Sequence, residues 1–206
     1  MAADAHWSPL IAVFTRAPVA GRGKTRLARI IGEAAALDLQ RALLERTLQA
    51  VTASAIDAEI WLDGDSSALP AHRLAVRHQR DGDLGQRMLD VIGDITARGR
   101  PAILIGSDCP VLDPPYLHAA ADALSSGADL VVGPVEDGGY VLIGMRRPHP
   151  DLLLGMTWST SSVCQETLRR AREAGLAPVV LDRLWDVDDE ASWRRWQRLS
   201  AATTDR

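Results

Sequence analysis

A glycine-rich loop near the N-terminus has the residue types of a phosphate-binding site. It spans residues 15–26, and its glycines and basic residues are Arg16, Gly21, Arg22, Gly23, Lys24 and Arg26. Glycines let backbone amides approach a phosphate, and a helix beginning at residue 25 would add the partial positive charge of its N-terminus. Lys24 is the only lysine among 23 basic residues, and lysine supplies a compact point charge that arginine does not. The loop is therefore a candidate phosphate-binding loop, although a flexible turn with incidental charges would have the same composition.

The same loop resembles a Walker A motif only in part. Gly23-Lys24-Thr25 matches the end of G-x-x-x-x-G-K-[ST], but the first glycine of that pattern falls on Pro18. Proline lacks the backbone N–H and fixes φ where a phosphate-binding loop needs an open backbone. This departure argues against a P-loop kinase.

Two acidic segments far apart in the chain have the residue types of a divalent-metal site. Asp108 follows the apolar run of residues 102–105, and Asp186, Asp188 and Asp189 occupy three of four consecutive positions near the C-terminus. Mg²⁺ takes one or two protein carboxylates and completes its shell with phosphate oxygens and water. A turn or helix cap is the alternative for Asp108, and capping explains one or two of the later acids. The excess of aspartates nevertheless favours a second metal ligand opposite Asp108.

Asp137, Gly138, Gly139 and Trp158 are candidate contacts for a second ligand. The two glycines directly precede an expected strand at residues 140–145, and they remove side-chain bulk so that a ligand can approach closely. Asp137 could hydrogen-bond a hydroxyl or accept its proton. Asp-Gly is also a strong hairpin-turn signal, so that interpretation stays open. Trp158 could pack on the C–H face of a sugar or belong to the core.

The elements that must position these residues alternate along the chain. Short apolar runs predict buried strands, and apolar spacing typical of a helix predicts amphipathic helices. The strands are expected at residues 10–14, 58–62, 74–76, 102–105, 129–132, 140–145 and 178–181, and the helices at 25–32, 33–53, 84–97, 114–124, 162–174 and 189–199. Ser162 and Gln165 have the spacing of a capping box. This alternation predicts an α/β fold with a parallel or mixed sheet covered on both faces, whose ligands gather at the carboxyl ends of the strands.

Composition limits the class of protein. With 206 residues, 47% apolar side chains and a net charge of −4, the chain fits one globular domain over residues 1–206, with residues 1–8 and 201–206 frayed. The charge argues against nucleic-acid binding. No apolar run reaches the length of a membrane helix, and no secretory signal is present, so we expect a cytoplasmic protein. Cys109 and Cys164 are too few for a disulfide framework, and we interpret Cys109 as a packed side chain.

The order of the motifs resembles a bacterial family of glycosyltransferases associated with arsenosugar biosynthesis. The similarity covers residues 10–193, and its segments are Phe14-Thr15-Arg16-Ala17-Pro18, Lys24-Thr25-Arg26-Leu27, Gly82-Asp83-Leu84-Gly85-Gln86-Arg87-Met88, Gly106-Ser107-Asp108-Cys109-Pro110, Asp137-Gly138-Gly139-Tyr140, Trp158-Ser159-Thr160 and Asp186-Val187-Asp188. That family belongs to the nucleotide-diphosphosugar transferase (GT-A) superfamily. The resemblance therefore implies a single Rossmann-like α/β domain with a mostly parallel mixed sheet flanked by helices. The superfamily also contains molybdenum-cofactor nucleotidyltransferases and 2-phospho-lactate guanylyltransferase, whose Lys-Ser-Arg-Leu is similar to residues 24–27.

The resemblance implies a role for each matching residue. The nucleotide-binding residues would be Thr15, Arg16, Gly21, Lys24, Arg26, Gly82, Gly85, Arg87 and Asp108. The sugar or acceptor would contact Asp137, Gly138, Gly139 and Trp158, and catalysis would use Lys24 and Asp137. Mg²⁺ or Mn²⁺ would be held by Asp108 and Asp188, with Asp186 as a substitute for Asp188. The family's acidic element is reduced here to the single carboxylate of Ser107-Asp108-Cys109.

The expected function is metal-dependent transfer of a sugar from a nucleotide-diphosphate sugar to a small acceptor. One alternative is a nucleotidyltransferase that joins a nucleoside triphosphate to a phosphorylated small molecule and releases pyrophosphate. A second is an inactive nucleotide-binding module. The expected partners are a nucleotide sugar or a nucleoside triphosphate plus a small acceptor, with neither nucleic acid nor membrane. The sequence leaves open the sugar, the base, the acceptor, the metal and the oligomeric state, for which a homodimer is one option.

Overall fold

A computed structural model describes residues 8–204, which contain a mixed seven-stranded sheet. The strands are β1 (Leu10–Arg16), β2 (Ala58–Asp63), β3 (Ala75–His78), β4 (Ala102–Ile105), β5 (Leu130–Pro134), β6 (Tyr140–Met145) and β7 (Pro178–Val180), in the order β3-β2-β1-β4-β6-β5-β7. Strand β6 runs antiparallel to β4 and β5, and every other pairing is parallel. The α/β class and the mixed sheet predicted from the sequence are confirmed.

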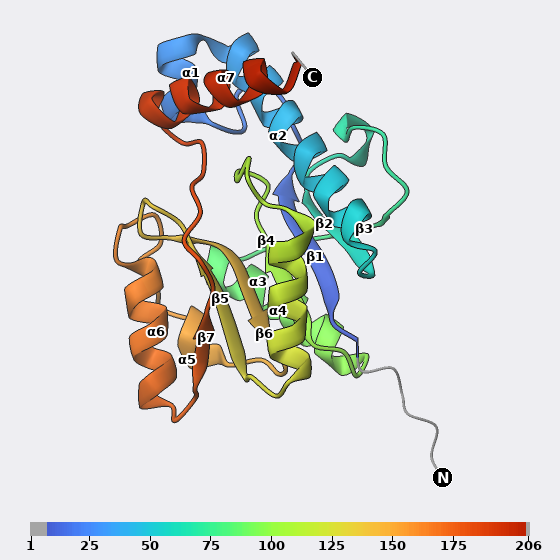
Figure 1. The fold of residues 1–206 in the computed structure, drawn as a ribbon, viewed down its shortest axis with the longest axis vertical. Coiled ribbons are helices and arrows are strands. Elements are labelled where there is room, and N and C mark those ends of the chain that lie inside the picture. The colour runs from blue at the N-terminus through green and yellow to red at the C-terminus, as the bar shows by residue number, and fades with distance from the viewer. Residues whose placement is uncertain (1–7, 205–206) are drawn as a thin grey trace.

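Helices cover both faces of this sheet (Figure 1). They are α1 (Thr25–Ile31), α2 (Glu33–Ser54), α3 (Leu84–Ala97), α4 (Pro114–Ser125), α5 (Pro150–Leu153), α6 (Val163–Glu173) and α7 (Glu190–Thr204). Alternate residues of β1 point to opposite faces: Ile11 and Val13 pack with α2 and α4, whereas Leu10 and Ala12 pack with α3, α5 and α6. None of the helices described within residues 8–204 is both long and apolar enough to cross a membrane.

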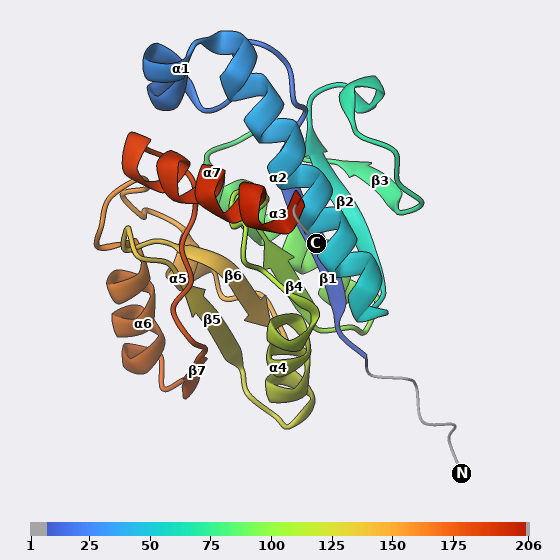
Figure 2. The same cartoon turned by 45° about the horizontal axis from the view of Figure 1, so that its top comes forward.

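The last helix packs back on the first two. Figure 2 shows α7 lying beside α1 and α2. Trp193 and Trp196 of α7 contact a third apolar cluster that contains Leu27 of α1 and Leu43 of α2. Helix α7 is therefore anchored on α1 and α2.

Some local predictions differ from the structure. The capping box is wrong, because Ser162 makes no side-chain cap bond and its hydroxyl instead lies 3.1 Å from that of Thr160. Helix α7 continues through Thr204, so residues 201–204, expected to be frayed, are helical. Ser8, also expected to be frayed, accepts hydrogen bonds from Arg100 at its carbonyl and its hydroxyl. The rest of the predicted frayed ends, residues 1–7 and 205–206, lie outside the described residues.

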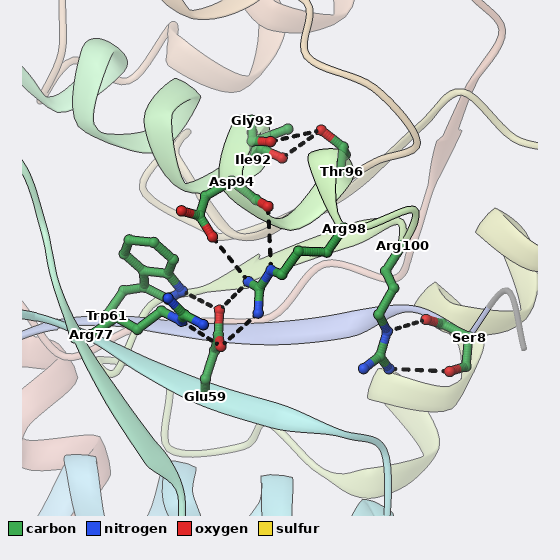
Figure 3. Close-up of polar contacts among 10 residues, drawn as sticks. All are labelled: Ser8, Glu59, Trp61, Arg77, Ile92, Gly93, Asp94, Thr96, Arg98 and Arg100. Carbon is green, nitrogen blue, oxygen red and sulfur yellow. Dashed lines mark hydrogen bonds and ion pairs between the residues drawn. The ribbon is translucent and has the colours of Figure 1, made fainter.

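A buried carboxylate ties the β3 edge of the sheet to helix α3 (Figure 3). Glu59 of β2 is only 4% exposed and accepts hydrogen bonds from Trp61 Nε1 at 2.8 Å, Arg77 Nε at 2.9 Å and Arg98 Nη2 at 2.6 Å. Burial alone would raise the pKa of Glu59, but the bonds from Arg98, Arg77 and Trp61 outweigh it and hold the pKa below its ordinary value. Glu59 is therefore ionised at neutral pH and fixes this edge electrostatically.

Candidate functional site

Lys24 lies at the edge of the sheet where the parallel strands β1 and β4 end. It caps helix α1 in the left-handed region, with φ of 51°, a conformation that a residue with a side chain rarely adopts. Its side chain is 3% exposed, and its Nζ lies 3.0 Å from Asp108 Oδ1 and 3.8 Å from Asp188 Oδ1. The ammonium also donates to the carbonyl of Val187. One buried cation thus joins the loops after β1 and β4 to the segment before α7.

The structure brings together the two acids predicted as metal ligands. Asp108 and Asp188 are 80 positions apart in the sequence, and each is about half exposed, at 49% and 50%. Among residues 8–204, no group of three or more His, Cys, Asp or Glu side chains is arranged to hold a metal ion. A pair of carboxylates that already shares one cation nevertheless fits Mg²⁺ or Mn²⁺, because phosphate oxygens and water commonly supply the remaining ligands.

Asp186 belongs to the same acidic cluster. Burial raises its pKa to about 6, and the negative charges of Asp137, Asp108 and Asp188 add to this effect while Lys24 opposes it. The sequence suggested Asp186 only as a substitute for Asp188. The structure instead gives it an environment of its own, in which it accepts a proton more readily than an ordinary aspartate.

A groove surrounds the buried lysine and has a volume of about 290 Å³. We call it the lysine groove, and its lining residues are Phe14, Thr15, Arg16, Gly23, Lys24, Gln40, Gln79, Leu84, Arg87, Gly106, Ser107, Asp108 and Asp188. The hydroxyls of Thr15 and Ser107 share a hydrogen bond of 2.9 Å across it. The groove therefore combines positive charge with hydroxyl and amide groups, as recognition of a phosphorylated polar ligand requires.

The arginines predicted to bind the nucleotide differ in exposure and in how tightly other side chains hold them. Arg87 is held between Asp63, at 3.1 Å, and the side-chain oxygen of Gln79, and it lies over the ring of Phe14. Arg16 is 60% exposed, 3.4 Å from Asp63, and Arg26 is 74% exposed, 3.9 Å from Asp188. Arg16 and Arg26 can turn toward an anion, whereas Arg87 serves to fix the wall of the groove.

An apolar pocket of about 230 Å³ adjoins the lysine groove. Its lining residues are Phe14, Leu84, Met88, Leu104, Ile105, Gly106, Asp137, Gly139, Tyr140, Val141, Ile143, Trp158, Ser159, Thr160 and Val163. The two spaces share Phe14, Leu84 and Gly106. Trp158 meets Tyr140 edge to face, with ring centroids 6.4 Å apart, so two aromatic rings shape one wall.

The Asp137 segment forms a turn at the rim of this pocket. Asp137 Oδ1 accepts a hydrogen bond of 2.8 Å from the backbone N–H of Gly139. Gly138 has φ of 92°, and a Cβ there would lie 2.0 Å from the carbonyl oxygen of Ser161. Turn geometry and packing therefore explain the Asp-Gly-Gly sequence locally, while Asp137 still lines the pocket.

The predicted glycines differ in how closely other atoms approach them. A Cβ on Gly85 would lie 2.2 Å from the carbonyl oxygen of Leu153 and 3.2 Å from the Trp158 ring. Gly82 has φ of 137°, and a Cβ there would lie 3.2 Å from the side chain of Gln86. Gly21 in the first loop has φ of 75°, and a Cβ there would meet no atom within 4 Å. Of these three glycines, Gly21 alone leaves open space beside its backbone.

No role was predicted from the sequence for several pocket residues. Phe14, Leu84 and Met88 lie within segments that carry the family resemblance, but no contact was predicted for them. Gln79 donates to the carbonyls of Thr15, at 3.0 Å, and Trp61, at 2.8 Å, but it belongs to no motif. Only three-dimensional contacts with distant residues reveal these roles.

Comparisons with known proteins give a family and a fold. The model of the family described as "Uncharacterized protein conserved in bacteria (DUF2064)" matches residues 30–160. This range includes Asp108 and Asp137 but not Lys24 or Asp188. The comparison with curated proteins finds no match.

Solved structures resemble the chain over most of its length. A protein of Desulfovibrio desulfuricans G20, named as a proposed nucleotide-diphospho-sugar transferase, has 30% identity and a TM-score of 0.80, over 87% of this chain and 82% of that one. The CMP:2-keto-3-deoxy-manno-octonic acid synthetase complexed with CTP has 15% identity and a TM-score of 0.56, over 95% and 99%. Rv0371c of Mycobacterium tuberculosis H37Rv in complex with manganese has 16% identity and a TM-score of 0.56, over 91% and 97%. The last two similarities establish the shared fold.

Proposed function

The chain belongs to the DUF2064 family, and from its fold and the lysine groove we propose that it is a transferase that takes a sugar from a nucleotide-diphosphate sugar. The observation that carries this proposal is the Lys24 ammonium, buried between Asp108 and Asp188 at the edge where α/β sheets bind ligands. The similarity to the Desulfovibrio desulfuricans protein supports the same class of donor. The arsenosugar-associated family remains a narrower hypothesis within this class.

The diphosphate would lie in the lysine groove. Lys24 and Arg16 line the groove and supply positive charge, and Arg26 lies 3.9 Å from Asp188, which also lines it. Asp108 and Asp188 would hold Mg²⁺ or Mn²⁺, which when bound neutralises negative charge on the departing nucleoside diphosphate. The manganese complex of Rv0371c, a protein of the same fold, supports this choice of ion.

In the proposed transfer step, Asp137 at the rim of the apolar pocket acts as the base. The oxygen of an acceptor hydroxyl forms a bond to the anomeric carbon of the sugar. The bond from that carbon to the diphosphate oxygen breaks, and its electron pair stays on the diphosphate. The hydroxyl proton passes to the carboxylate of Asp137, whose orientation is fixed by the N–H of Gly139. Lys24 stabilises the charge that develops on the leaving group.

Nucleotidyl transfer is the second candidate, supported by the fold shared with a synthetase that binds CTP. In that reaction the phosphate of a phosphorylated substrate attacks the α-phosphorus of a nucleoside triphosphate, and pyrophosphate leaves. Lys24 would serve this reaction as well, because both reactions place a nucleotide's phosphates in the lysine groove.

The product released distinguishes the two reactions. The purified protein would be incubated with nucleotide sugars or nucleoside triphosphates, with Mn²⁺ or Mg²⁺, and its thermal unfolding would be followed in parallel. We expect a metal-dependent thermal shift and release of nucleoside diphosphate. Release of pyrophosphate would establish the second candidate instead. Ligand binding without turnover of any donor would indicate an inactive nucleotide-binding module and overturn the proposal.

The metal assignment has a matched pair of variants. Asp108→Asn should abolish the metal-dependent part of the thermal shift. Asp113→Asn should leave it unchanged, because Asp113 caps α4 by accepting from the N–H of Tyr116, and asparagine caps helices about as well as aspartate. Equal shifts in the two variants would show that Asp108 does not hold the ion.

A further inference from the structure

The apolar pocket contains no positive charge, although it adjoins the lysine groove. No lysine, arginine or histidine is among the described residues that line it, and the one carboxylate among them is Asp137. A phosphate group there would lose its hydration without gaining a cation, and it would also meet a carboxylate of the same charge. Burying an unpaired charge in this way is strongly unfavourable. The pocket is therefore unfavourable for a phosphate group placed inside it.

Its size and walls fit one ring-sized apolar group. The inner surface is formed by Met88, Leu104 and Ile143, and the rings of Tyr140 and Trp158 stand edge to face at one side. An apolar cavity of about 150 Å³ accepts benzene, and this pocket has about 230 Å³. A nucleobase fits less well, because these aliphatic side chains offer no partners for its ring nitrogens and carbonyl oxygens.

Apart from the buried hydroxyl of Tyr140, the polar side chains that line the pocket are Asp137, Ser159 and Thr160. Asp137 Oδ1 is held by Gly139, and Oδ2 makes no hydrogen bond with any other described residue. Ser159 and Thr160 lie at the same pocket. A ligand whose apolar body enters the pocket can therefore present a hydroxyl to Asp137.

We infer that the apolar pocket binds the acceptor of the proposed sugar transfer, and that this acceptor is an uncharged hydroxyl compound with a ring-sized apolar body. The inference rests on the proposed function and narrows it to acceptors that carry no phosphate. It also disfavours nucleotidyl transfer to a phosphorylated substrate, the form of that reaction considered above.

Two probes that differ in charge test the inference: 2-phenylethanol and 2-phenylethyl phosphate. The indole N–H resonance of Trp158 would be followed in two-dimensional NMR spectra and assigned by its loss in Trp158→Phe. With a nucleoside diphosphate filling the lysine groove, so that the ester cannot place its phosphate there, we expect the alcohol to shift this resonance saturably. We also expect it to bind at least about tenfold more tightly than the ester, the factor that about 1.4 kcal/mol gives. The shift should persist with a nucleoside diphosphate present, because the two ligands occupy adjoining spaces. Displacement of the alcohol by the nucleotide would assign the pocket to the base and overturn the inference.

Two leucines of nearly equal exposure provide matched variants. Leu84 lines the pocket and is 38% exposed, whereas Leu154 lies outside it and is 37% exposed. Leu84→Ser should weaken alcohol binding by about threefold or more, as loss of part of a leucine contact implies, and Leu154→Ser should not. Equal effects of both variants would overturn the inference.

Failure of the inference and failure of the proposed function give different results. If nucleoside diphosphate is released from a nucleotide sugar but the ester binds as tightly as the alcohol, the inference is wrong and the proposed function stands. If no donor is turned over, the proposed function is wrong whatever the probes do.

Discussion

Replacing Lys24 with methionine should strengthen the binding of a free divalent cation and weaken the binding of nucleotide. The methionine keeps an unbranched side chain of similar length but removes the charge. In the structure that charge lies between Asp108 and Asp188, so it repels any other cation at the same carboxylates. A nucleotide diphosphate has the opposite charge and loses an attraction in the variant.

The distances set the size of this effect. Two unit charges 3.0 Å apart interact by about 5.5 kcal/mol at an effective dielectric constant of 20 and by about 1.4 kcal/mol in bulk water. Asp108 is 49% exposed, so solvent screening favours the lower end of this range. If Mn²⁺ no longer has to compete with an interaction of about 1.4 kcal/mol between Lys24 and Asp108, it should bind about tenfold more tightly. The variant without metal should also be less stable by about 1–3 kcal/mol, because the neighbouring aspartates lose their buried counter-ion.

Mn²⁺ binding would be measured by the electron paramagnetic resonance of the free ion, and stability by thermal unfolding with and without Mn²⁺. We expect Mn²⁺ to raise the unfolding temperature of Lys24→Met more than that of the original protein. Arg26→Met is the control, because Arg26 is 74% exposed and 3.9 Å from Asp188, and its charge is largely screened. If Lys24→Met binds Mn²⁺ no better than the original protein, Lys24 does not compete with a metal and the proposed ligand pair is wrong.

Two further predictions concern stability. Glu59→Gln should lower the free energy of unfolding by about 2 kcal/mol at pH 7, because it weakens charge-assisted hydrogen bonds to a buried carboxylate. Since the folded pKa of Glu59 lies below its ordinary value of 4.5, this contribution to stability is complete above about pH 4.5 and is lost as the pH falls through the folded pKa. Urea unfolding from pH 7 to 3 should therefore show a smaller loss of unfolding free energy in the variant than in the original protein. The same loss in both proteins would contradict the role given to Glu59. Gly85→Ala should lower the free energy of unfolding by about 2 kcal/mol, because its Cβ would lie 2.2 Å from a backbone oxygen. Gly93→Ala in the same helix should raise that free energy by about 0.5–1 kcal/mol, because the nearest atom to its Cβ would be 4.0 Å away. Similar unfolding temperatures for the two alanine variants would refute the packing argument.

The fold could be predicted where burial leaves a strong pattern in the sequence. The continuous apolar run of β4 is fully buried, and its predicted bounds agree with the structure. Strand β3, at the edge of the sheet, has a mostly exposed pattern, and its predicted position was shifted toward the N-terminus. Helix α5 has only four residues, too few to show helical periodicity, and it was missed.

Only those site residues could be predicted that have chemically distinctive side chains and follow the end of a predicted strand. The rule that ligands gather at strand ends selected Lys24, Asp108 and Asp188, and the structure brings these three together. Their chemical roles remain predictions. The packing of Gly85 on Leu153 involves residues 68 positions apart, and no local pattern reveals such a contact. Three residues that line the apolar pocket, Asp137, Gly139 and Trp158, were predicted as contacts for a sugar or acceptor, but its aliphatic lining was not predicted.

The choice of lysine at position 24 follows from the three oxygens around it. The ammonium is 3% exposed and approaches one oxygen each from Asp108, Val187 and Asp188. A compact cation can serve three converging acceptors, whereas the planar guanidinium of arginine needs more room and directs its donors into one plane. The other 22 basic residues are arginines. The local geometry at position 24 therefore accounts for a lysine in a chain that otherwise uses arginine. Because the same ammonium joins the first loop to the segment before α7, a ligand that displaces one of its contacts would also weaken the link between these two segments.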